Sequence, residues 1–302
     1  MINVMKMVSI FLFLLFFLGL CQLTSQQPPQ ELPVTVQLIK GNLNAAKLFI
    51  VKGGSGANCG FFVGAKGVVV IDAKMTADAA KQMIAEIRKI TPLPITHVLI
   101  THSDGDHVNG LGGFPTGLKI LAHARTKKDM EEAFQKDAAL KPLLAYLPNQ
   151  TFTDNFDLKG LGEEIRLLYF GPAHTSGDVV VFFPAEKIAF IGDLAFIGRD
   201  PLIHREKGGT SFGLVANLKK ILELDAETFI SGHNDPLTIK DIQGLSSSIE
   251  EKQAKVKDMI KAGQTLDEIK QAFGIADQAG VPAGRRWPSL VEVIYLELTE
   301  KK

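Results

Sequence analysis

Short apolar runs alternate with a helical pattern along the chain, and their order predicts the fold class. In the first part, β-branched and aromatic runs separated by glycine and asparagine turns predict antiparallel strands within 34–39, 46–52, 59–64 and 67–73. From Thr76 the apolar residues follow the period of a helix, and Thr76 itself is the expected N-cap. These elements predict a sheet of antiparallel strands followed by a covering helix.

The second part repeats this alternation. Further strands are predicted within 95–101, 164–170, 178–184, 187–193 and 227–233, a strand followed by a helix within 117–134, and a helix over 211–224. After about Leu237 the pattern is helical, and Thr265 and Glu268 have the spacing of a capping box. Two rounds of strands and helices favour a sheet packed on a sheet with helices outside, rather than one parallel sheet.

The N-terminal residues have the pattern of an export signal. Lys6 precedes an apolar core from Val8 to Leu20, which is shorter than the roughly 20 residues of a membrane-spanning helix. We expect a signal peptide over 1–25 and a polar linker over 26–33, with a membrane anchor as the alternative. Cys21 also allows lipidation, although Leu20 replaces the small residue usual before a lipidated cysteine. The expected location is exported, either periplasmic or secreted.

Composition narrows the classes of partner. The chain has 302 residues, of which 46% are hydrophobic and 22% charged, and its formal net charge is zero. This balance argues against a nucleic-acid partner, and we expect a small-molecule substrate and contact with a membrane only through the N-terminal segment. With Cys21 removed or lipidated, Cys59 is the remaining cysteine of the mature chain, and its apolar neighbours predict a small buried side chain rather than a nucleophile.

Residues that can bind metals stand at the ends of four predicted strands. They are His102, Asp104, Asp106, His107, His174, Asp193 and His233. Four of the seven histidines of the chain belong to this set. Imidazole and carboxylate suit zinc, iron or manganese, and two metals need about this number of ligands. A calcium loop of the EF-hand type is excluded, because Val108 and Pro115 stand at two of its oxygen-ligand positions.

The set resembles the metallo-β-lactamase superfamily, whose signature is His-x-His-x-Asp-His after a strand, followed by a separate His, Asp (or Cys) and His. The similarity of order and strand placement extends from about Val34 to Leu237. It implies an α/β fold, a four-layer αββα sandwich of two mixed β-sheets flanked by helices. We expect this domain to cover 34–240, with a helical extension over 241–302 packed on it.

The resemblance also implies a ligand set. One metal would take His102, Asp104 and His174, the second would take Asp106, His107 and His233, Asp193 would bridge the two, and Asp72 would brace the motif loop from outside. Asp104 departs from the family, which has histidine at that position. Its carboxylate is shorter and charged, and it would make metal-bound water less acidic. Three outcomes stay open: a dinuclear site with altered metal preference, a mononuclear site at Asp106, His107 and His233, and a degenerate site.

The function implied is that of an exported metal-dependent hydrolase, in which metal-bound hydroxide attacks the carbonyl of a β-lactam, lactone, ester or thioester. Asp106 is the expected catalytic residue, and two zinc ions per chain are the expected cofactor, with iron or manganese as alternatives. The bridging Asp193 is similar to the glyoxalase II and lactonase branches, whereas the commonest β-lactamases of the superfamily have cysteine there. A mononuclear iron oxidoreductase and a non-catalytic binding protein with a degenerate site are the alternative functions.

The loop 196–212 follows Asp193 and is expected to border the substrate. His204 is the candidate substrate-binding residue in it, and Arg205 is a second candidate for contact with an anionic group. A solvated loop without a role in the site is the more common alternative for such a segment.

Overall fold

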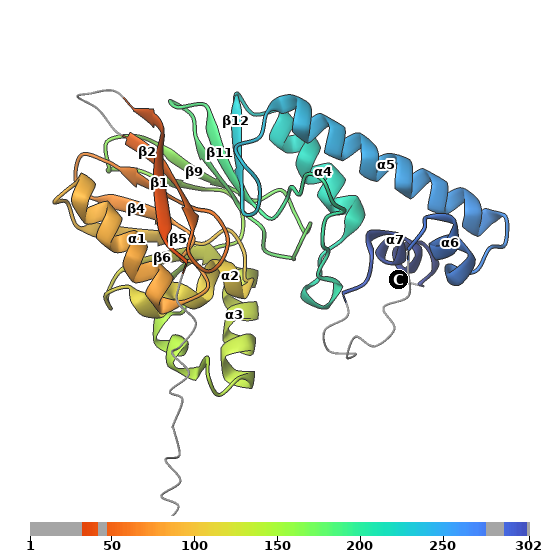
Figure 1. Cartoon of the computed structure of the whole chain (residues 1–302), viewed down its shortest axis with the longest axis horizontal. Helices are drawn as coiled ribbons and strands as arrows, with labels where there is room; N and C mark the ends of the chain where they lie inside the picture. The colour runs from red at the N-terminus through yellow and green to blue at the C-terminus, as the bar shows by residue number, and fades with distance from the viewer. Residues whose placement is uncertain (1–31, 42–46, 276–286, 301–302) are drawn as a thin grey trace, which may run out of the picture. The chain divides into compact units, whose positions relative to one another are not determined.

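Figure 1 shows the computed structural model, which describes residues 32–41, 47–275 and 287–300. Within these residues the first sheet has seven strands in chain order: β1 (Val34–Gly41), β2 (Lys47–Gly53), β3 (Cys59–Val63), β4 (Val68–Ile71), β5 (Ile95–Leu99), β6 (Lys119–His123) and β7 (Gln150–Phe152). Strands β1 to β4 pair antiparallel, and β4 to β7 pair parallel. The predicted signal peptide and the possible lipidation site at Cys21 lie outside the described residues.

The second sheet of the described residues has five strands in the order β12-β11-β10-β9-β8. Their bounds are β8 (Phe156–Leu158), β9 (Ile165–Leu168), β10 (Val180–Phe183), β11 (Ile188–Gly192) and β12 (Thr228–Ser231). The β11–β12 pair is parallel and the other pairs are antiparallel, so both sheets are mixed, as the resemblance implied.

Helices cover the outer face of each sheet (Figure 1). The longer helices are α1 (Ala77–Ile90), α3 (Ala124–Lys136), α4 (Ser211–Leu222), α5 (Ile239–Lys261), α6 (Leu266–Ala272) and α7 (Leu290–Thr299). Short helical turns are α2 (Gly105–Val108) and three 3-10 segments at Asn109–Gly113, Lys141–Tyr146 and Arg205–Lys207. The predicted arrangement of two packed sheets with helices outside is therefore confirmed.

Three apolar layers follow from this arrangement. The α1 residues Met83 and Ile87 pack against the first sheet, and side chains such as Leu99 and Phe183 fill the space between the sheets. Helices α4, α5 and α7 share the third layer with the second sheet, where Val256 is fully buried. The sheets are thus buried on both faces, which fixes the strand ends that carry the candidate ligands.

Most element predictions are confirmed. The Thr76 side chain accepts a hydrogen bond from the Ala79 backbone N–H at 3.1 Å, and Thr265 and Glu268 form the predicted capping box. Strands β7 and β8 were not predicted, because each has only three residues and too few positions to show a period of two. Cys59 is 1% exposed, and burial raises the pKa of its thiol to about 11, which agrees with the predicted apolar role.

The C-terminal helices belong to the same apolar layer as α4. Helix α5 begins at Ile239, two residues before the predicted extension at 241, and Ile242 and Ile249 of this helix are buried with Leu218 of α4. Among the described residues, no helix has the length and apolar character needed to cross a membrane.

Stability of the fold is expected to decrease as pH rises from about 4.5 through about 7, because of Glu186 in the turn between β10 and β11. Burial and the neighbouring carboxylate of Glu163 raise its pKa from 4.5 to about 7. The folded chain therefore retains this proton over a pH range in which the unfolded chain has lost it, so stability falls across that range. Glu186→Gln should melt at a higher temperature than the parent at pH 8 and close to it at pH 4.

Thermal unfolding measured across this pH range tests the prediction. The matched control is Glu251→Gln on the exposed face of α5, which should follow the parent curve. Parallel curves for Glu186→Gln and the parent would contradict the assignment.

Candidate metal centre

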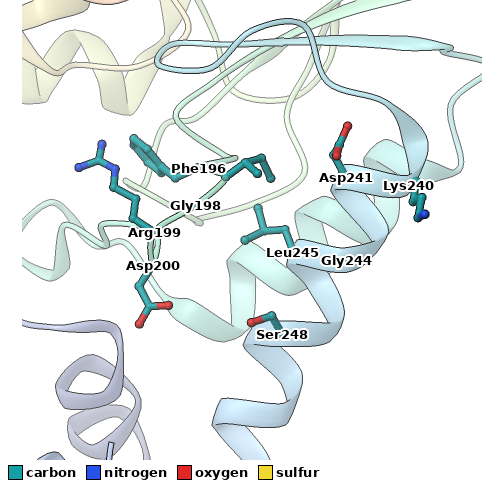
Figure 2. A pocket seen from close by; sticks show the side chains of 10 residues that line it. Phe196, Gly198, Arg199, Asp200, Lys240, Asp241, Gly244, Leu245 and Ser248 are labelled. Atoms are coloured by element: carbon teal, nitrogen blue, oxygen red, sulfur yellow. The ribbon is translucent and has the colours of Figure 1, made fainter. Parts of the chain in front are cut away.

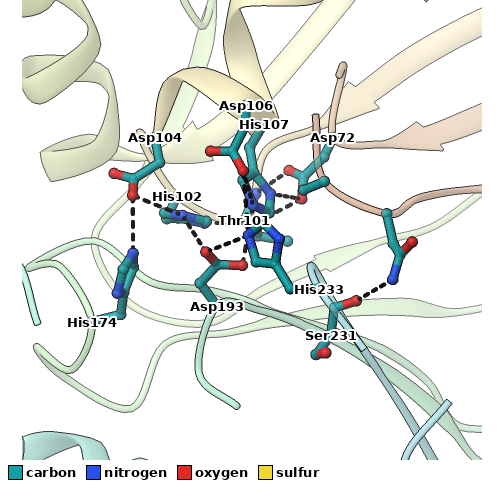
Figure 3. A network of polar contacts seen from close by, with 12 residues as sticks. Asp72, Thr101, His102, Asp104, Asp106, His107, His174, Asp193, Ser231 and His233 are labelled. Carbon is teal, nitrogen blue, oxygen red and sulfur yellow. Dashed lines mark hydrogen bonds and ion pairs between the residues drawn. The ribbon is translucent and has the colours of Figure 1, made fainter. Parts of the chain in front are cut away.

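The seven predicted ligands come together at the ends of strands from both sheets (Figure 3). They form two groups whose ligand atoms lie within 4.8 Å of one another: His102, Asp104, His174 and Asp193 in one, and Asp106, His107 and His233 in the other. The loop after β5, with the short helix α2, supplies four of the seven. The resemblance had implied these seven residues as metal ligands, with Asp193 shared between the two groups, and their binding of metal stays a prediction.

Asp193 lies between the two groups. Its Oδ2 is 3.0 Å from His233 Nε2 and 3.9 Å from His102 Nε2, and its Oδ1 is 3.1 Å from His107 Nε2. The side chain is only 5% exposed. One buried carboxylate therefore faces a histidine of each group, which is the geometry required of a bridging ligand.

Buried polar atoms at this centre fit a metal. Within the described part of the chain, His102 Nε2 is buried without a hydrogen-bond partner, and its nearest carboxylate oxygens lie 3.7 and 3.9 Å away. His107 Nε2 and Asp193 Oδ1 are also buried and face each other at 3.1 Å as an ion pair without the geometry of a hydrogen bond. A buried polar atom without a partner costs about 1–3 kcal/mol unless a cation or another group satisfies it. A Cβ at Gly232 would lie 2.2 Å from Asp193 Oδ1, so the absence of a side chain there keeps the space around the carboxylate open. The donor set is the nitrogen and oxygen mixture that zinc, iron and manganese accept.

Asp72 braces the centre from the end of β4. Its Oδ2 accepts hydrogen bonds from His107 Nδ1 at 2.7 Å and Thr101 Oγ1 at 2.8 Å, and its Oδ1 accepts one from the Thr101 backbone N–H at 2.8 Å. A hydrogen held on Nδ1 leaves Nε2 of His107 free to face the centre. The Asp72 backbone is left-handed, with φ of 60°, a conformation that aspartate tolerates better than most residues.

Lys74 is a supporting residue that the sequence did not single out. It is fully buried, and its Nζ donates hydrogen bonds to the carbonyl oxygens of Ala57 at 2.7 Å and Gly53 at 2.8 Å. This fixes the glycine-rich turn against the site, where the Ala57 N–H donates to the Asp106 carbonyl at 3.2 Å. These hydrogen bonds give the turn a structural role. Lys74 lies three positions beyond the end of β4, and a single charged residue there carries no periodic signal of such a role.

The carboxylates and imidazoles of the centre shift one another's pKa values. Burial alone would lower the pKa of His174, but the Asp104 carboxylate raises it to about 9. Hydrogen bonds to Asp106 and Asp193 likewise raise the pKa of His233 to about 9. Burial raises the pKa of Asp193, yet His107, His233 and His102 together hold this carboxylate well below its usual range. The centre is therefore a set of ionised carboxylates balanced by protonated imidazoles when no metal is present.

Asp104 has neighbours that the sequence did not predict. Its Oδ2 lies 2.9 Å from His204 Nε2 and 3.1 Å from His174 Nε2, and its Oδ1 lies 2.6 Å from Lys207 Nζ. His204 is 3% exposed, so the solvated-loop alternative is wrong for this residue. Lys207 was missed because its contact with Asp104 spans 103 positions of sequence. Arg205 pairs instead with Glu300, the residue that follows α7, at 2.6 Å.

A pocket of about 530 Å³ opens onto both groups. Its wall includes ligands from each group, the apolar side chains of Met75, Leu202 and Trp287, and the ammonium of Lys207. A second hollow, of about 600 Å³, is lined by Phe196, Arg199 and the start of α5 (Figure 2). The Phe196 ring stacks on His233 with centroids 5.3 Å apart, so this hollow lies beside the metal centre.

Comparison with known proteins gives a family match. The model of the metallo-β-lactamase superfamily matches residues 53–233, which include all seven ligands. A relative named metallo-β-lactamase type 2, from Elizabethkingia meningoseptica, is 29% identical over 240 residues, covering 76% of this chain and 90% of its own. A relative named 2,4-dinitroanisole O-demethylase subunit alpha, from Nocardioides sp., is 26% identical over 68% of this chain and 61% of its own.

Solved structures agree on the fold. The sec-alkylsulfatase Pisa1 from Pseudomonas sp. superposes with a TM-score of 0.64 and 16% identity, covering 84% of this chain and 50% of its own. This chain therefore spans about half the length of that structure and 61% of the demethylase subunit.

Removing the Asp72 charge should weaken metal binding. Asp72→Asn keeps a residue that tolerates the left-handed backbone, but it loses the anion that holds His107 Nδ1. Loss of such an outer partner typically costs ~10–100-fold in metal affinity. Titration with zinc against a competing chelator measures the change, with Asp78→Asn on the exposed part of α1 as the matched control. Unchanged zinc affinity in Asp72→Asn would show that this carboxylate does not orient His107.

Metal uptake should release protons and strengthen as pH rises. His174 and His233 have pKa values of about 9 in the metal-free chain, so both are protonated at pH 7.5 and must lose those protons to bind a metal. Burial would lower the pKa of His107, but Asp193 and Asp72 hold it well above its usual value, so His107 has a proton to lose as well. We expect zinc affinity to rise between pH 6.5 and 9, with at least two protons released per chain at pH 7.5. Calorimetry in two buffers of different ionisation enthalpy counts the protons. A flat affinity over this range would contradict the charge balance described above.

Proposed function

The chain belongs to the metallo-β-lactamase superfamily, and on this premise we propose that it is a dizinc hydrolase that cleaves the carbonyl bond of a lactone, ester, thioester or β-lactam. At the level of the family it is a metal-dependent hydrolase. The observation that carries the finer proposal is the position of Asp193, which faces His102 of one ligand group and His107 of the other. A mononuclear site would not need a buried carboxylate between two complete sets of donors.

The residues divide between two metal positions. His102, Asp104 and His174 would hold the first metal, Asp106, His107 and His233 the second, and Asp193 would contact both. Bound divalent metal there supplies a Lewis acid that polarises a carbonyl and lowers the pKa of water. The tautomers suit this role: Asp72 holds Nδ1 of His107, and the Leu202 carbonyl lies 2.7 Å from Nδ1 of His174.

Asp106 is the proposed catalytic residue. It lies on the pocket wall with its side chain 26% exposed, and its Oδ2 is 3.2 Å from His233 Nε2. Burial raises its pKa, but the hydrogen bond from His233 and the charges of His107 and His102 together lower it, so the carboxylate is ionised at neutral pH. An ionised carboxylate at the edge of the pocket can orient a water molecule and accept its proton while the oxygen attacks the carbonyl carbon.

The pocket indicates what the substrate looks like. Met75, Leu202 and Trp287 form an apolar wall, which suits a hydrocarbon acyl or alcohol portion. Lys207 places one ammonium on the same wall, next to the ligand group of Asp104. His204 was predicted to bind substrate; its contact with Asp104 instead favours the role proposed in the next subsection.

Export to the periplasm or the medium is part of the proposal. It is supported by the apolar core from Val8 to Leu20 behind Lys6, followed by a polar segment.

Replacement of Asp106 tests the proposed chemistry. Asp106→Asn should lower kcat by ~10²–10⁴-fold, because the amide cannot accept the proton of the attacking water. The assay uses the zinc-loaded full chain and a panel of a lactone, an aryl ester, a thioester, a chromogenic β-lactam and an alkyl sulfate. Chelation should abolish the activity and zinc should restore it. The control is Asp78→Asn, which should match the parent.

Two outcomes would overturn the proposal. One is a fully zinc-loaded parent that turns over the alkyl sulfate and none of the carbonyl compounds. The other is a protein that purifies with one iron and has no hydrolytic activity in its zinc form, which would favour the oxidoreductase alternative.

A further inference from the structure

The first metal position has lost a histidine to Asp104, yet the structure places a different histidine beside it. His204 lies 100 positions further along the chain, on the loop between β11 and α4. Its Nε2 is 2.9 Å from Asp104 Oδ2, the same oxygen that lies 3.1 Å from His174 Nε2 and 3.7 Å from His102 Nε2. Nitrogens of three imidazoles therefore converge on Oδ2 of Asp104.

His204 is oriented in the way metal-ligating histidines are. Its Nδ1 lies 2.7 Å from Glu206 Oε1, so the carboxylate holds a hydrogen on Nδ1 and leaves Nε2 for the centre. His107 has the same arrangement with Asp72, and His174 has it with the Leu202 carbonyl. A histidine that only filled space in the core would not need its second nitrogen anchored while the first faces the Asp104 carboxylate.

The backbone fixes this position. The His204 N–H donates to the His174 carbonyl at 2.8 Å, and the Gly209 N–H donates to the His204 carbonyl at 2.9 Å. A Cβ at Gly209 would lie 2.3 Å from the His174 carbonyl oxygen, so this close approach of the two loops requires glycine. The His204 ring lies edge-on to the His174 ring, with centroids 4.8 Å apart. The two histidines thus belong to one rigid unit.

The same loop also supplies a positive charge that balances the negative charge of Asp104. Exchange of a histidine for Asp104 adds one negative charge to the first position, which would weaken the Lewis acidity of a metal there. Lys207 Nζ is 2.6 Å from Asp104 Oδ1, on the oxygen that does not face the three imidazoles. One turn of chain, from His204 to Lys207, therefore supplies both an imidazole and a balancing positive charge.

We propose that His204 is a ligand of the first metal, completing a set of three histidines with His102 and His174, while Lys207 neutralises Asp104. This inference rests on the proposed dinuclear centre. It assigns to the loop 196–212 the histidine that the motif itself lacks.

Metal content provides the test and does not depend on activity. The full chain is stripped with a chelator, reloaded with zinc, dialysed and analysed for zinc per chain. We expect two zinc ions in the parent and one in His204→Ala, with the affinity of the lost metal reduced by more than the ~10–100-fold that an outer partner is worth. The matched control is His97→Ala in the middle of β5, outside both ligand groups, which should keep two.

A reciprocal variant sharpens the test. In Asp104→His/His204→Ala the histidine returns to the motif, so the second zinc should return although His204 is absent. Retention of two zinc ions at parental affinity in His204→Ala would overturn the inference, and failure of the double variant to regain the lost zinc would do so as well.

A measurement on the parent chain covers the case in which His204→Ala does not fold. Zinc added to protein with ¹⁵N-labelled histidine should shift the Nε2 signals of five of the seven histidines, those at 102, 107, 174, 204 and 233. A shift of four, with His204 unaffected, would overturn the inference.

The two proposals fail in different ways. A parent that binds two zinc ions through His204 but hydrolyses nothing on the panel overturns the proposed function alone. An active dizinc parent whose His204→Ala variant keeps both metals overturns only the assignment of His204.

Discussion

The constraint on which this structure depends is the close approach of carboxylates that cannot all be ionised without positive partners. Asp104, Asp106 and Asp193 all lie within 4 Å of imidazole nitrogens, and Asp193 is almost completely buried. Charges of one sign at such separations repel strongly in a medium less polar than water. The positive partners in the structure are histidines from several loops and Lys207, and His102 Nε2 still has no hydrogen-bond partner within the described residues. A divalent metal would balance the carboxylate charge and contact that nitrogen as well.

The two sheets make that approach possible. Their facing sides bury a layer of apolar side chains, which holds the ends of β5, β11 and β12 at a common edge. The turns at this edge adopt backbone conformations that place main-chain atoms close to the candidate ligands. Asp72 and Lys74 both have left-handed backbones, and Lys74 uses a fully buried ammonium to hold the glycine-rich turn. Strain and desolvation of this kind persist only where the surrounding packing over-determines the local structure.

Sequence reasoning could predict what repeats or clusters along the chain. The apolar runs predicted most strands, and the resemblance of the motif around His102 to the metallo-β-lactamase superfamily implied the two ligand groups. What it missed depends on contacts between distant positions. Strands β7 and β8 are too short for a period, Lys74 is a single charged residue after a strand, and Lys207 meets Asp104 across 103 positions. The fold was therefore predictable from local pattern, whereas the charge balance of the centre required the structure.

Asp104 stands where the family has histidine, and the imidazoles around it are oriented by acceptors at Nδ1. Such an acceptor serves a protonated imidazole in the metal-free chain and also fixes the tautomer that would present Nε2 to a metal. Here those groups are in place around both positions: Asp72 on His107, the Leu202 carbonyl on His174 and Glu206 on His204. Each leaves Nε2 facing the centre. Lys207 pairs with Asp104 and balances its negative charge, and His204 supplies an imidazole beside the position where the motif has no histidine. These two contacts, both made by one loop, are the basis of the proposal that His204 takes the place of the histidine that the motif lacks at position 104.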